Sequence, residues 1–340
     1  MSSYQVTLIF EDGRVAKFNA DEEDTVYFSA LKNRVRILTD CLEGACATCK
    51  ATCTSGTYTL DEFTDEALTM DEYERREVLT CQMRLKSDCV IEFPYESRIA
   101  LKSQPQIQKN EVTEITMISS TVSRLVLAPV SDVAGIEFLP GQYVHLSVPG
   151  TDQHRSYSFA NPVFKNEQYI FYVKLLDDGV MSEYLAQRAN VGDEIDLTGP
   201  FGRFYLRPVE RPIIMVAGGT GLAPMLSMLD TLSVAKNSDY SIRVLYGEND
   251  PGEFFAVDQL EGYRTSGLDL AVEYCSVTGN SGWKGPTGHV TSLLRPEILN
   301  GGDSEIYLCG PPPMIEAAET WLATQGVDAA LIHAEKFVPS

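Results

Sequence analysis

The stretch Cys41-Leu-Glu-Gly-Ala-Cys46-Ala-Thr-Cys49 carries three cysteines with C-x4-C-x2-C spacing, and a fourth cysteine, Cys81, follows downstream. This spacing is typical of the ligands of a [2Fe–2S] cluster, whose iron atoms are held by four thiolates. Three of them come from one tight loop, in which Gly44 and Ala45 leave room for the backbone to wrap closely. We expect backbone N–H groups of this loop to point at the sulfurs. The metal ligands predicted from the spacing are Cys41, Cys46, Cys49 and Cys81.

Zinc and disulfides are the alternatives for these cysteines. Zinc sites usually consist of two C-x2-4-C pairs, and only Cys46 and Cys49 form such a pair here. Disulfides need an oxidising compartment, for which the sequence gives no signal. Three other cysteines, Cys53, Cys89 and Cys275, fit no ligand spacing, and we expect them to be small buried side chains.

Length and charge narrow the functional classes. The chain has 340 residues, enough for two or three domains, and 44% of them are hydrophobic. The N-terminus lacks the pattern of a secretory signal, and no apolar run is long enough to span a membrane, so we expect a cytoplasmic protein. The net charge of −21 makes nucleic acid an improbable partner. The acidic surface serves either solubility or attraction toward a protein partner with a basic face.

The first domain is predicted to be α+β and to cover residues 1–97, followed by a linker over residues 98–110. Residues 4–18 alternate apolar and polar around Asp12-Gly13, which predicts a β-hairpin. A helix is expected near Thr25–Asn33, where Phe28 and Leu31 have helical spacing.

Two further domains are predicted from a change in pattern. Residues 111–207 contain short alternating runs separated by Gly/Pro turns, which indicate an antiparallel β-barrel. Residues 208–340 instead alternate buried strands with helices, which indicates a doubly wound parallel sheet.

Two turns in the last domain are candidates for binding a dinucleotide. The strand Ile213–Ala217 leads into Gly218-Gly219-Thr220-Gly221, with Pro224 in the following helix. A turn without side chains lets backbone N–H groups approach a pyrophosphate at a helix N-terminus. Cys309-Gly310-Pro311 follows another predicted strand and would lie at the same edge of the sheet. The alternatives are glycines needed only for the turn, and a cysteine that only fills the core.

Further motifs lie between these segments. They are Arg155-Ser-Tyr157-Ser158, Val173-Lys174-Leu175 and Gly179-Val-Met181-Ser182. In this order, behind the cysteine loop, the motifs resemble the ferredoxin–NAD(P)+ reductase superfamily with an N-terminal plant-type ferredoxin domain. The chain most resembles the reductase components of bacterial benzoate/toluate-type dioxygenases, and the resemblance covers nearly the whole length.

The resemblance implies a β-grasp ferredoxin domain, an FAD-binding barrel and an NAD-binding sheet. It implies that Tyr157 packs on the flavin ring, Arg155 holds the pyrophosphate and Ser158 lies near the reacting flavin nitrogen. Val173–Leu175 and Gly179–Ser182 would be later flavin segments, the second touching phosphate. Gly218–Pro224 and Cys309–Met314 would hold the nicotinamide nucleotide, and Cys309, like Ser158, would place or stabilise the reacting rings.

The C-terminus resembles the family only in part. Glu335-Lys336-Phe337 is similar to the E-x-aromatic ending that covers the flavin in plant-type reductases, but Val338-Pro339-Ser340 follow it here. Glu335 is therefore a candidate catalytic residue and Phe337 a candidate flavin contact. A surface tail is the alternative.

The implied function is conversion of electron pairs into single electrons. NADH gives up two electrons together, a [2Fe–2S] cluster accepts one, and a flavin can mediate between them. The expected partner is a terminal Rieske oxygenase; the alternatives are the reductase of a soluble di-iron monooxygenase and a redox sensor.

NADH is preferred over NADPH because the loop Gly247-Glu248-Asn249-Asp250 offers carboxylates and no basic group for a 2′-phosphate. Glu248 is the first candidate for the ribose contact and Asp250 the second. A merely solvated acidic loop is the alternative.

Overall fold

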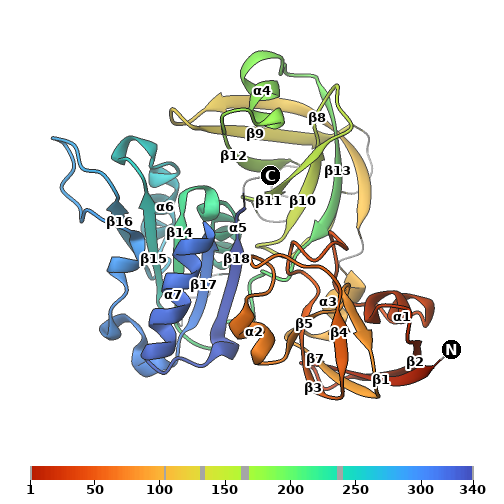
Figure 1. The fold of residues 1–340 in the computed structure, drawn as a ribbon. Helices are drawn as coiled ribbons and strands as arrows, with labels where there is room; N and C mark the ends of the chain where they lie inside the picture. Colours follow the sequence, from red (N-terminus) through yellow and green to blue (C-terminus); the bar gives the residue numbers. More distant parts are fainter. Residues whose placement is uncertain (1, 103–104, 131–134, 162–167, 236–239, 339–340) are drawn as a thin grey trace. The chain divides into compact units, whose positions relative to one another are not determined.

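The computed structural model describes residues 2–102, 105–130, 135–161, 168–235 and 240–338. The chain forms two compact units (Figure 1). The first consists of Met1–Pro105 and Pro200–Arg203, and the second of Gln106–Gly199 and Phe204–Ser340.

The first unit is built on a five-stranded mixed sheet of order β2-β1-β7-β3-β5. Its strands are β1 (Ser3–Phe10), β2 (Val15–Asp21), β3 (Lys50–Ser55), β5 (Glu77–Leu79) and β7 (Cys89–Phe93). Strands β1 and β2 pair antiparallel, which confirms the predicted hairpin, and β1 pairs parallel with β7. A second small sheet pairs β4 (Tyr58–Leu60) with β6 (Met83–Leu85). This is the predicted α+β class.

Three short helices complete this unit. They are α1 (Val26–Lys32), α2 (Met70–Glu74) and α3 (Ser97–Lys102). The side chain of Thr25 accepts a hydrogen bond from Phe28 N and so begins α1, as the sequence predicted for this stretch. A capping box of Thr69 and Glu72 begins α2 directly before β5, on the segment that leads to Cys81.

Most of the described residues in the segment expected to be a linker, residues 98–110, have regular secondary structure; residues 103 and 104 lie outside the described residues. Helix α3 covers its first part, and β8 (Gln106–Met117) its last part. The side chains of Ile99 and Ala100 are 5% and 3% exposed, so apolar burial explains why this polar stretch is helical. The predicted domain boundaries themselves remain a prediction.

The second unit contains a six-stranded sheet of order β11-β10-β13-β8-β9-β12. The remaining strands are β9 (Val122–Pro129), β10 (Tyr143–Ser147), β11 (His154–Ser158), β12 (Tyr169–Lys174) and β13 (Glu194–Phe201). Helix α4 (Val180–Gln187) follows β12. Inward residues such as Val144, Leu146 and Phe171 are fully buried in one core. This barrel-like antiparallel sheet matches the predicted fold.

The rest of the second unit is a parallel sheet of order β16-β15-β14-β17-β18. Its strands are β14 (Ile213–Gly218), β15 (Ile242–Glu248), β16 (Leu270–Ser276), β17 (Glu305–Gly310) and β18 (Ile332–Lys336). The helices are α5 (Leu222–Ala235), α6 (Val257–Thr265) and α7 (Pro312–Thr324). Short 3-10 turns are η1 (Gly219–Gly221), η2 (Pro251–Glu253), η3 (Val290–Leu293), η4 (Pro296–Ile298), η5 (Asn300–Gly302) and η6 (Ala329–Leu331).

Helices cover both faces of this sheet (Figure 1). Met215 and Val244 share one hydrophobic core with α5 and α6, whereas Val216 and Leu245 share another with α7 and η3. Strand side chains are thus buried on both faces, as a parallel sheet requires. The predicted doubly wound fold is confirmed.

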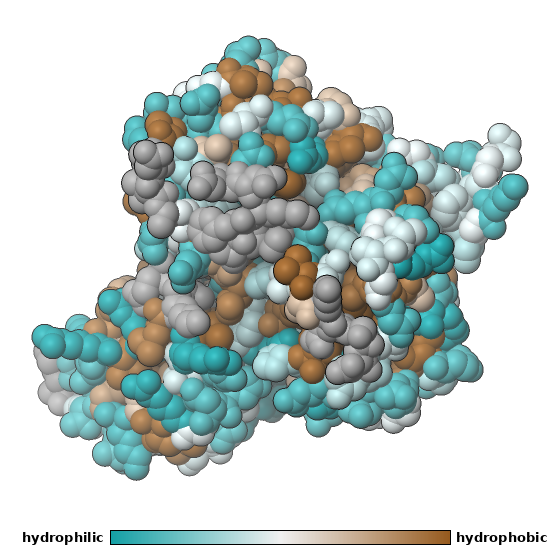
Figure 2. Space-filling model, turned by 180° about the vertical axis from the view of Figure 1, so that it is seen from behind, coloured by the Kyte–Doolittle hydropathy of each residue, from teal (hydrophilic) through white to brown (hydrophobic). Residues whose placement is uncertain are grey.

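The surface is dominated by polar and charged side chains. Figure 2 shows hydrophilic groups interspersed with smaller hydrophobic patches on one face. Among the described residues, no helix is long and apolar enough to cross a membrane.

Candidate functional site

The cysteine loop folds so that its sulfurs lie in two close pairs. Cys49 Sγ lies 3.3 Å from Cys81 Sγ, and the thiols of Cys41 and Cys46 are hydrogen-bond partners. No disulfide joins either pair: all four cysteines are free thiols. Two pairs provide the four sulfur donors that a two-iron cluster requires, so the residues fit this group.

Backbone conformation wraps the loop around these sulfurs. Leu42, Gly44 and Ala47 all have positive φ, and a Cβ at Gly44 would come within 2.6 Å of the Glu62 carbonyl oxygen. Only glycine is accommodated there, because the loop passes so close to the neighbouring segment. The amide of Ala45 donates to Cys41 Sγ at 3.4 Å, as expected from the sequence.

The environment favours the thiolate form of one cysteine in each pair, Cys41 and Cys81. The hydrogen bond from Cys46 lowers the pKa of Cys41 to about 5, and that from Cys49 lowers the pKa of Cys81. Cys49 and Cys81 lie in an apolar cluster with Leu68 and Leu79. Three of the four remaining cysteines, Cys53, Cys89 and Cys275, are 0%, 2% and 0% exposed, as predicted for core residues.

In the second unit, Arg155 and Tyr157 lie on β11 opposite the core residues Leu146 and Val144 of β10. Directly opposite residues of an antiparallel pair share one face, so Arg155 and Tyr157 lie on the inward side. Arg155 donates to Gln153 Oε1 and to the His154 carbonyl. Burial raises the pKa of Tyr157, which keeps its phenol neutral.

The other predicted flavin segments end β12 and begin α4. Val173 is buried, and Leu175 is partly buried against the barrel core. The ammonium group of Lys174 donates a hydrogen bond to Thr121 Oγ1. Gly179 caps α4 without a side chain of its own, and Ser182 Oγ accepts the Leu176 amide at 2.8 Å. Met181 is 2% exposed and packs in the barrel core. A helix N-terminus without a side-chain cap suits a phosphate.

Three predicted catalytic residues from three strands approach one another. Ser158 Oγ at the end of β11 lies 3.4 Å from Glu335 Oε2 on β18. Glu335 is the register partner of Cys309 across the parallel pair β17–β18. Burial raises the pKa of Glu335 to about 8, against the lowering effect of the Ser158 hydrogen bond. The site therefore contains a carboxyl group that is mostly protonated near neutral pH.

Glu335, Lys336 and Phe337 are held against the sheet and do not form a surface tail. Glu335 and Lys336 are in β18, and the Phe337 amide donates to the Gly310 carbonyl at 2.8 Å. The Phe337 ring packs on the core that includes Cys309. Cys309 itself is fully buried, and burial raises the pKa of its thiol.

The two glycine turns meet at the carboxyl edge of β14 and β17. A Cβ at Gly221 would lie 2.2 Å from the Cys309 carbonyl oxygen, and one at Gly310 would lie 3.2 Å from Gly218 Cα. A Cβ at Gly218 would lie 2.7 Å from Met314 Sδ. These glycines are needed for packing, whereas at Gly219, which has a φ of 57°, a Cβ would meet only Glu248 Oε2, at 3.9 Å. Thr220 and Pro224 lie in η1 and the first turn of α5. Pro311 caps α7.

The acidic loop after β15 is arranged differently from the sequence-based expectation. Glu248 is the last residue of the strand, is 6% exposed and accepts a hydrogen bond from Tyr246 Oη at 2.8 Å. Burial raises its pKa to about 7, despite the opposing effect of that bond. Asp250 is exposed, and its Oδ2 accepts from Thr278 Oγ1 at 3.1 Å. Of the two carboxylates, Asp250 is the one that faces solvent.

Known proteins match the three parts of the chain. Residues 9–86 match the description "2Fe-2S iron-sulfur cluster binding domain", residues 109–205 "Oxidoreductase FAD-binding domain" and residues 215–320 "Oxidoreductase NAD-binding domain". The toluate 1,2-dioxygenase electron transfer component of Pseudomonas putida is 37% identical over 339 residues, covering 99% of both chains. The chain belongs to the ferredoxin–NAD(P)+ reductase superfamily, with an N-terminal [2Fe–2S] ferredoxin domain.

Other relatives of this reductase span most of its length. Methane monooxygenase component C of Methylosinus trichosporium is 37% identical over 303 residues, 87% of each chain. The crystal structure of the Amycolatopsis cytochrome P450 reductase GcoB has a TM-score of 0.73 and 24% identity, and covers 99% of both chains. The latter supports the fold alone.

Sequence reasoning missed several polar residues of the reductase. Gln82 Nε2 donates to the Leu42 carbonyl at 2.8 Å and to Cys81 Sγ at 3.6 Å, so it ties the cluster loop to the fourth cysteine. In the sequence, Gln82 could have been identified from its position directly after the fourth cysteine, Cys81. Glu253 in η2 accepts hydrogen bonds from the turn between β8 and β9, and no motif indicated that contact.

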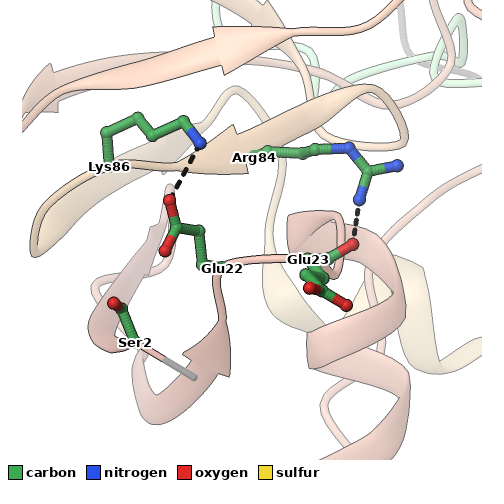
Figure 3. Close-up of a pocket in the computed structure, with 5 residues that line it drawn as sticks. All are labelled: Ser2, Glu22, Glu23, Arg84 and Lys86. Carbon is green, nitrogen blue, oxygen red and sulfur yellow. Dashed lines mark hydrogen bonds and ion pairs between the residues drawn. The ribbon is translucent and has the colours of Figure 1, made fainter.

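One pocket of the reductase lies away from all predicted site residues. It has a volume of about 500 Å³ and is lined by Ser2, Glu22, Glu23, Arg84 and Lys86 (Figure 3). Lys86 pairs with Glu22 at 3.0 Å, and Arg84 donates to the Glu23 carbonyl and pairs with Asp61. These contacts connect β6 and the residue after it to the segment before α1, so we assign these side chains a structural role.

Proposed function

We propose that this reductase takes electrons from NADH at FAD and passes them singly through the [2Fe–2S] cluster to a terminal Rieske oxygenase of the benzoate/toluate type. The observation that carries the proposal is the full-length similarity to a toluate 1,2-dioxygenase electron transfer component. The similarity to methane monooxygenase component C covers less of the chain. Free thiolates favour a reducing compartment, so we assign the protein to the cytoplasm.

Each cofactor has a set of residues that would hold it. The cluster would be held by Cys41, Cys46, Cys49 and Cys81. FAD would be held by Arg155, Tyr157, Ser158, Val173, Lys174, Leu175, Gly179, Met181, Ser182 and Phe337. The nucleotide would be held by Gly218, Gly219, Thr220, Gly221, Pro224, Glu248, Asp250, Cys309, Gly310 and Pro311. When bound, the flavin accepts an electron pair and releases single electrons to the cluster.

The chain's own residues would orient the reacting groups. Cys309 and Glu335 lie side by side on β17 and β18, and Ser158 approaches Glu335 from the barrel. A neutral Glu335 can donate a hydrogen bond, whereas an ionised one could only accept. The raised pKa of Glu335 therefore makes it a candidate donor toward the flavin or nicotinamide ring.

The test is reconstitution with two oxygenases. Purified reductase and NADH would be mixed with a benzoate/toluate-type Rieske oxygenase or with a di-iron hydroxylase, and hydroxylated product measured. We expect product with the Rieske enzyme. Product with only the di-iron enzyme would favour the runner-up function. Rapid reduction of artificial acceptors, with neither oxygenase supported, would favour a sensor role.

A further inference from the structure

Glu253 connects the nucleotide-binding sheet to the barrel within the second unit. Its carboxylate accepts hydrogen bonds from three consecutive hydroxyl groups, those of Ser119, Ser120 and Thr121. The Ser119 contact measures 2.6 Å. These hydroxyls lie in the turn between β8 and β9, whereas Glu253 ends η2, directly beyond the loop that contains Asp250. Three donors on one carboxylate form a specific clamp between the two halves of the unit.

The nucleotide side of this clamp is rigidly joined to the candidate ribose site. Asp250 caps η2, with its Oδ1 accepting the Gly252 amide at 2.9 Å. The amide of Glu253 in turn donates to the Asp250 carbonyl at 3.0 Å. Because one hydrogen-bonded turn holds both acids, moving Glu253 also moves Asp250.

The barrel side of the clamp is joined to a predicted flavin segment. The Leu175 amide donates to the Thr121 carbonyl at 2.8 Å, and the Lys174 ammonium donates to Thr121 Oγ1. Thr121 therefore contacts both Glu253 and the end of β12. Leu175 and Lys174 belong to the stretch that the sequence assigned to flavin binding.

Electrostatics hold the Glu253 carboxylate ionised. Burial opposes ionisation, but the hydrogen bonds from Ser119, Ser120 and Thr121 and the charge of Lys174 lower the pKa to about 2. An ionised carboxylate offers enough lone pairs to accept all three hydroxyls at once. Charge-assisted hydrogen bonds of this kind are stronger than neutral ones.

We propose that Glu253 is a positioning residue for electron transfer from the nicotinamide nucleotide to the flavin, acting by clamping the Ser119–Thr121 turn. This rests on the proposed function. Glu253 need not touch either cofactor, because it fixes the nucleotide loop against the flavin segment. Small misplacements of reacting groups cost large factors in rate.

The substitution Glu253→Gln keeps the size of the side chain but removes the charge and one acceptor. We expect the limiting rate of flavin reduction by NADH to fall about tenfold, because docking of the nucleotide against the flavin becomes imprecise. The dissociation constant for NADH should change much less, since the substitution leaves Asp250 and the backbone hydrogen bonds of its turn in place. Thr121→Val removes the facing hydroxyl and should produce a similar loss.

The experiment uses full-length, cofactor-loaded protein in a stopped-flow instrument, with Glu253→Gln, Thr121→Val and the double variant. Non-additive losses are expected, because both substitutions weaken the same hydrogen bond, from Thr121 Oγ1 to the Glu253 carboxylate. Asp258→Asn, which removes an exposed acid of α6, is the matched control and should leave the rate unchanged. As a readout independent of turnover, amide hydrogen exchange of residues 119–121 should accelerate in Glu253→Gln and not in Asp258→Asn.

The outcomes separate this proposal from the proposed function. If neither NADH nor NADPH reduces the flavin of the unsubstituted protein, the proposed function fails and this proposal with it. If the unsubstituted protein is reduced and the Glu253→Gln protein is reduced at the same limiting rate, only the clamp fails. Strictly additive effects of the two substitutions would also overturn it. If Glu253→Gln does not retain flavin, Thr121→Val and the exchange rates decide the matter.

Discussion

The hydroxyl of Ser158 lies 3.4 Å from the Glu335 carboxyl oxygen, although the two residues are separated by most of the second unit's sequence. Ser158 ends a barrel strand, and Glu335 lies on the last strand of the parallel sheet. The contact therefore joins the predicted flavin and nucleotide parts at their reacting ends. The hydrogen bond from Ser158 also lowers the pKa of this carboxyl, against the larger raising effect of burial.

This carboxyl should make stability depend on pH. Burial raises the pKa of Glu335 from 4.5 to about 8, so the folded state favours the protonated form. Its contribution to stability is fully present below the unfolded value and is lost as pH rises through about 8. Urea unfolding of flavin-free protein at pH 5, 7 and 9 should show a smaller decline in Glu335→Gln than in the unsubstituted protein. Equal declines would contradict the raised pKa.

Glu248 provides an internal comparison for that measurement. Burial raises its pKa to about 7, so its contribution to stability is also lost as pH rises, but through a lower range. Glu248→Gln should therefore reduce the decline between pH 5 and 7 and leave the decline between pH 7 and 9 nearly unchanged. The two substitutions should give effects that add, because no hydrogen bond or ion pair between these side chains is found in the described residues.

A second prediction concerns Cys309. Its side chain is fully buried at the end of β17, beside Glu335 on the neighbouring strand. Cys309→Ala should slow reduction of the flavin by NADH while leaving the protein folded and flavinated. Stopped-flow absorbance measures the rate, and flavin content measures occupancy. Cys275→Ala, at a buried cysteine of β16, is the control; an unchanged rate in Cys309→Ala would make Cys309 a packing residue.

Individual motifs of this site could be predicted from sequence, but their convergence could not. Arg155–Ser158, Cys309 and Glu335 each stand in a local pattern that identifies a strand end or a turn. That Ser158 contacts Glu335 depends on how barrel and sheet pack, which local spacing does not encode. The C-terminal strand could likewise not be predicted. Ile332–Lys336 is extended because it pairs with β17, and its local composition does not indicate a strand.

Burial explains the remaining differences from expectation. The apolar spacing of Phe28 and Leu31 predicted α1, yet these side chains are 45% and 41% exposed, while Val26, Ser29 and Ala30 are buried. Small residues of α1 allow close packing on the sheet, which a count of large apolar side chains misses. Glu248 was expected in the loop after the strand as the first candidate for the ribose contact. The strand instead extends over Gly247 and Glu248, and the side chain is buried and accepts a hydrogen bond from Tyr246.

A third prediction tests the cluster ligands. Cys46→Ser or Cys81→Ser should abolish the visible absorbance of the cluster, because each substitution breaks one of the two thiol pairs. NADH-to-ferricyanide activity should remain, since the flavin and nucleotide residues belong to the other unit. Cys53→Ser is the control, because Cys53 is buried in β3 and lies outside the loop. A full cluster in both ligand variants would show that the assignment is wrong.

The last prediction concerns the choice between NADH and NADPH. The loop after β15 contains Glu248 and Asp250 and no basic residue, so a 2′-phosphate would meet negative charge without a partner. Because Glu248 is buried and bonded to Tyr246, Asp250 is now the better candidate for the ribose contact. We expect kcat/KM to favour NADH, Asp250→Asn to reduce that preference, and Glu248→Gln to change it little. Steady-state kinetics with both nucleotides measures all three. A preference for NADPH in the unsubstituted protein would overturn the assignment of the loop, and a loss confined to Glu248→Gln would restore Glu248 as the selective residue.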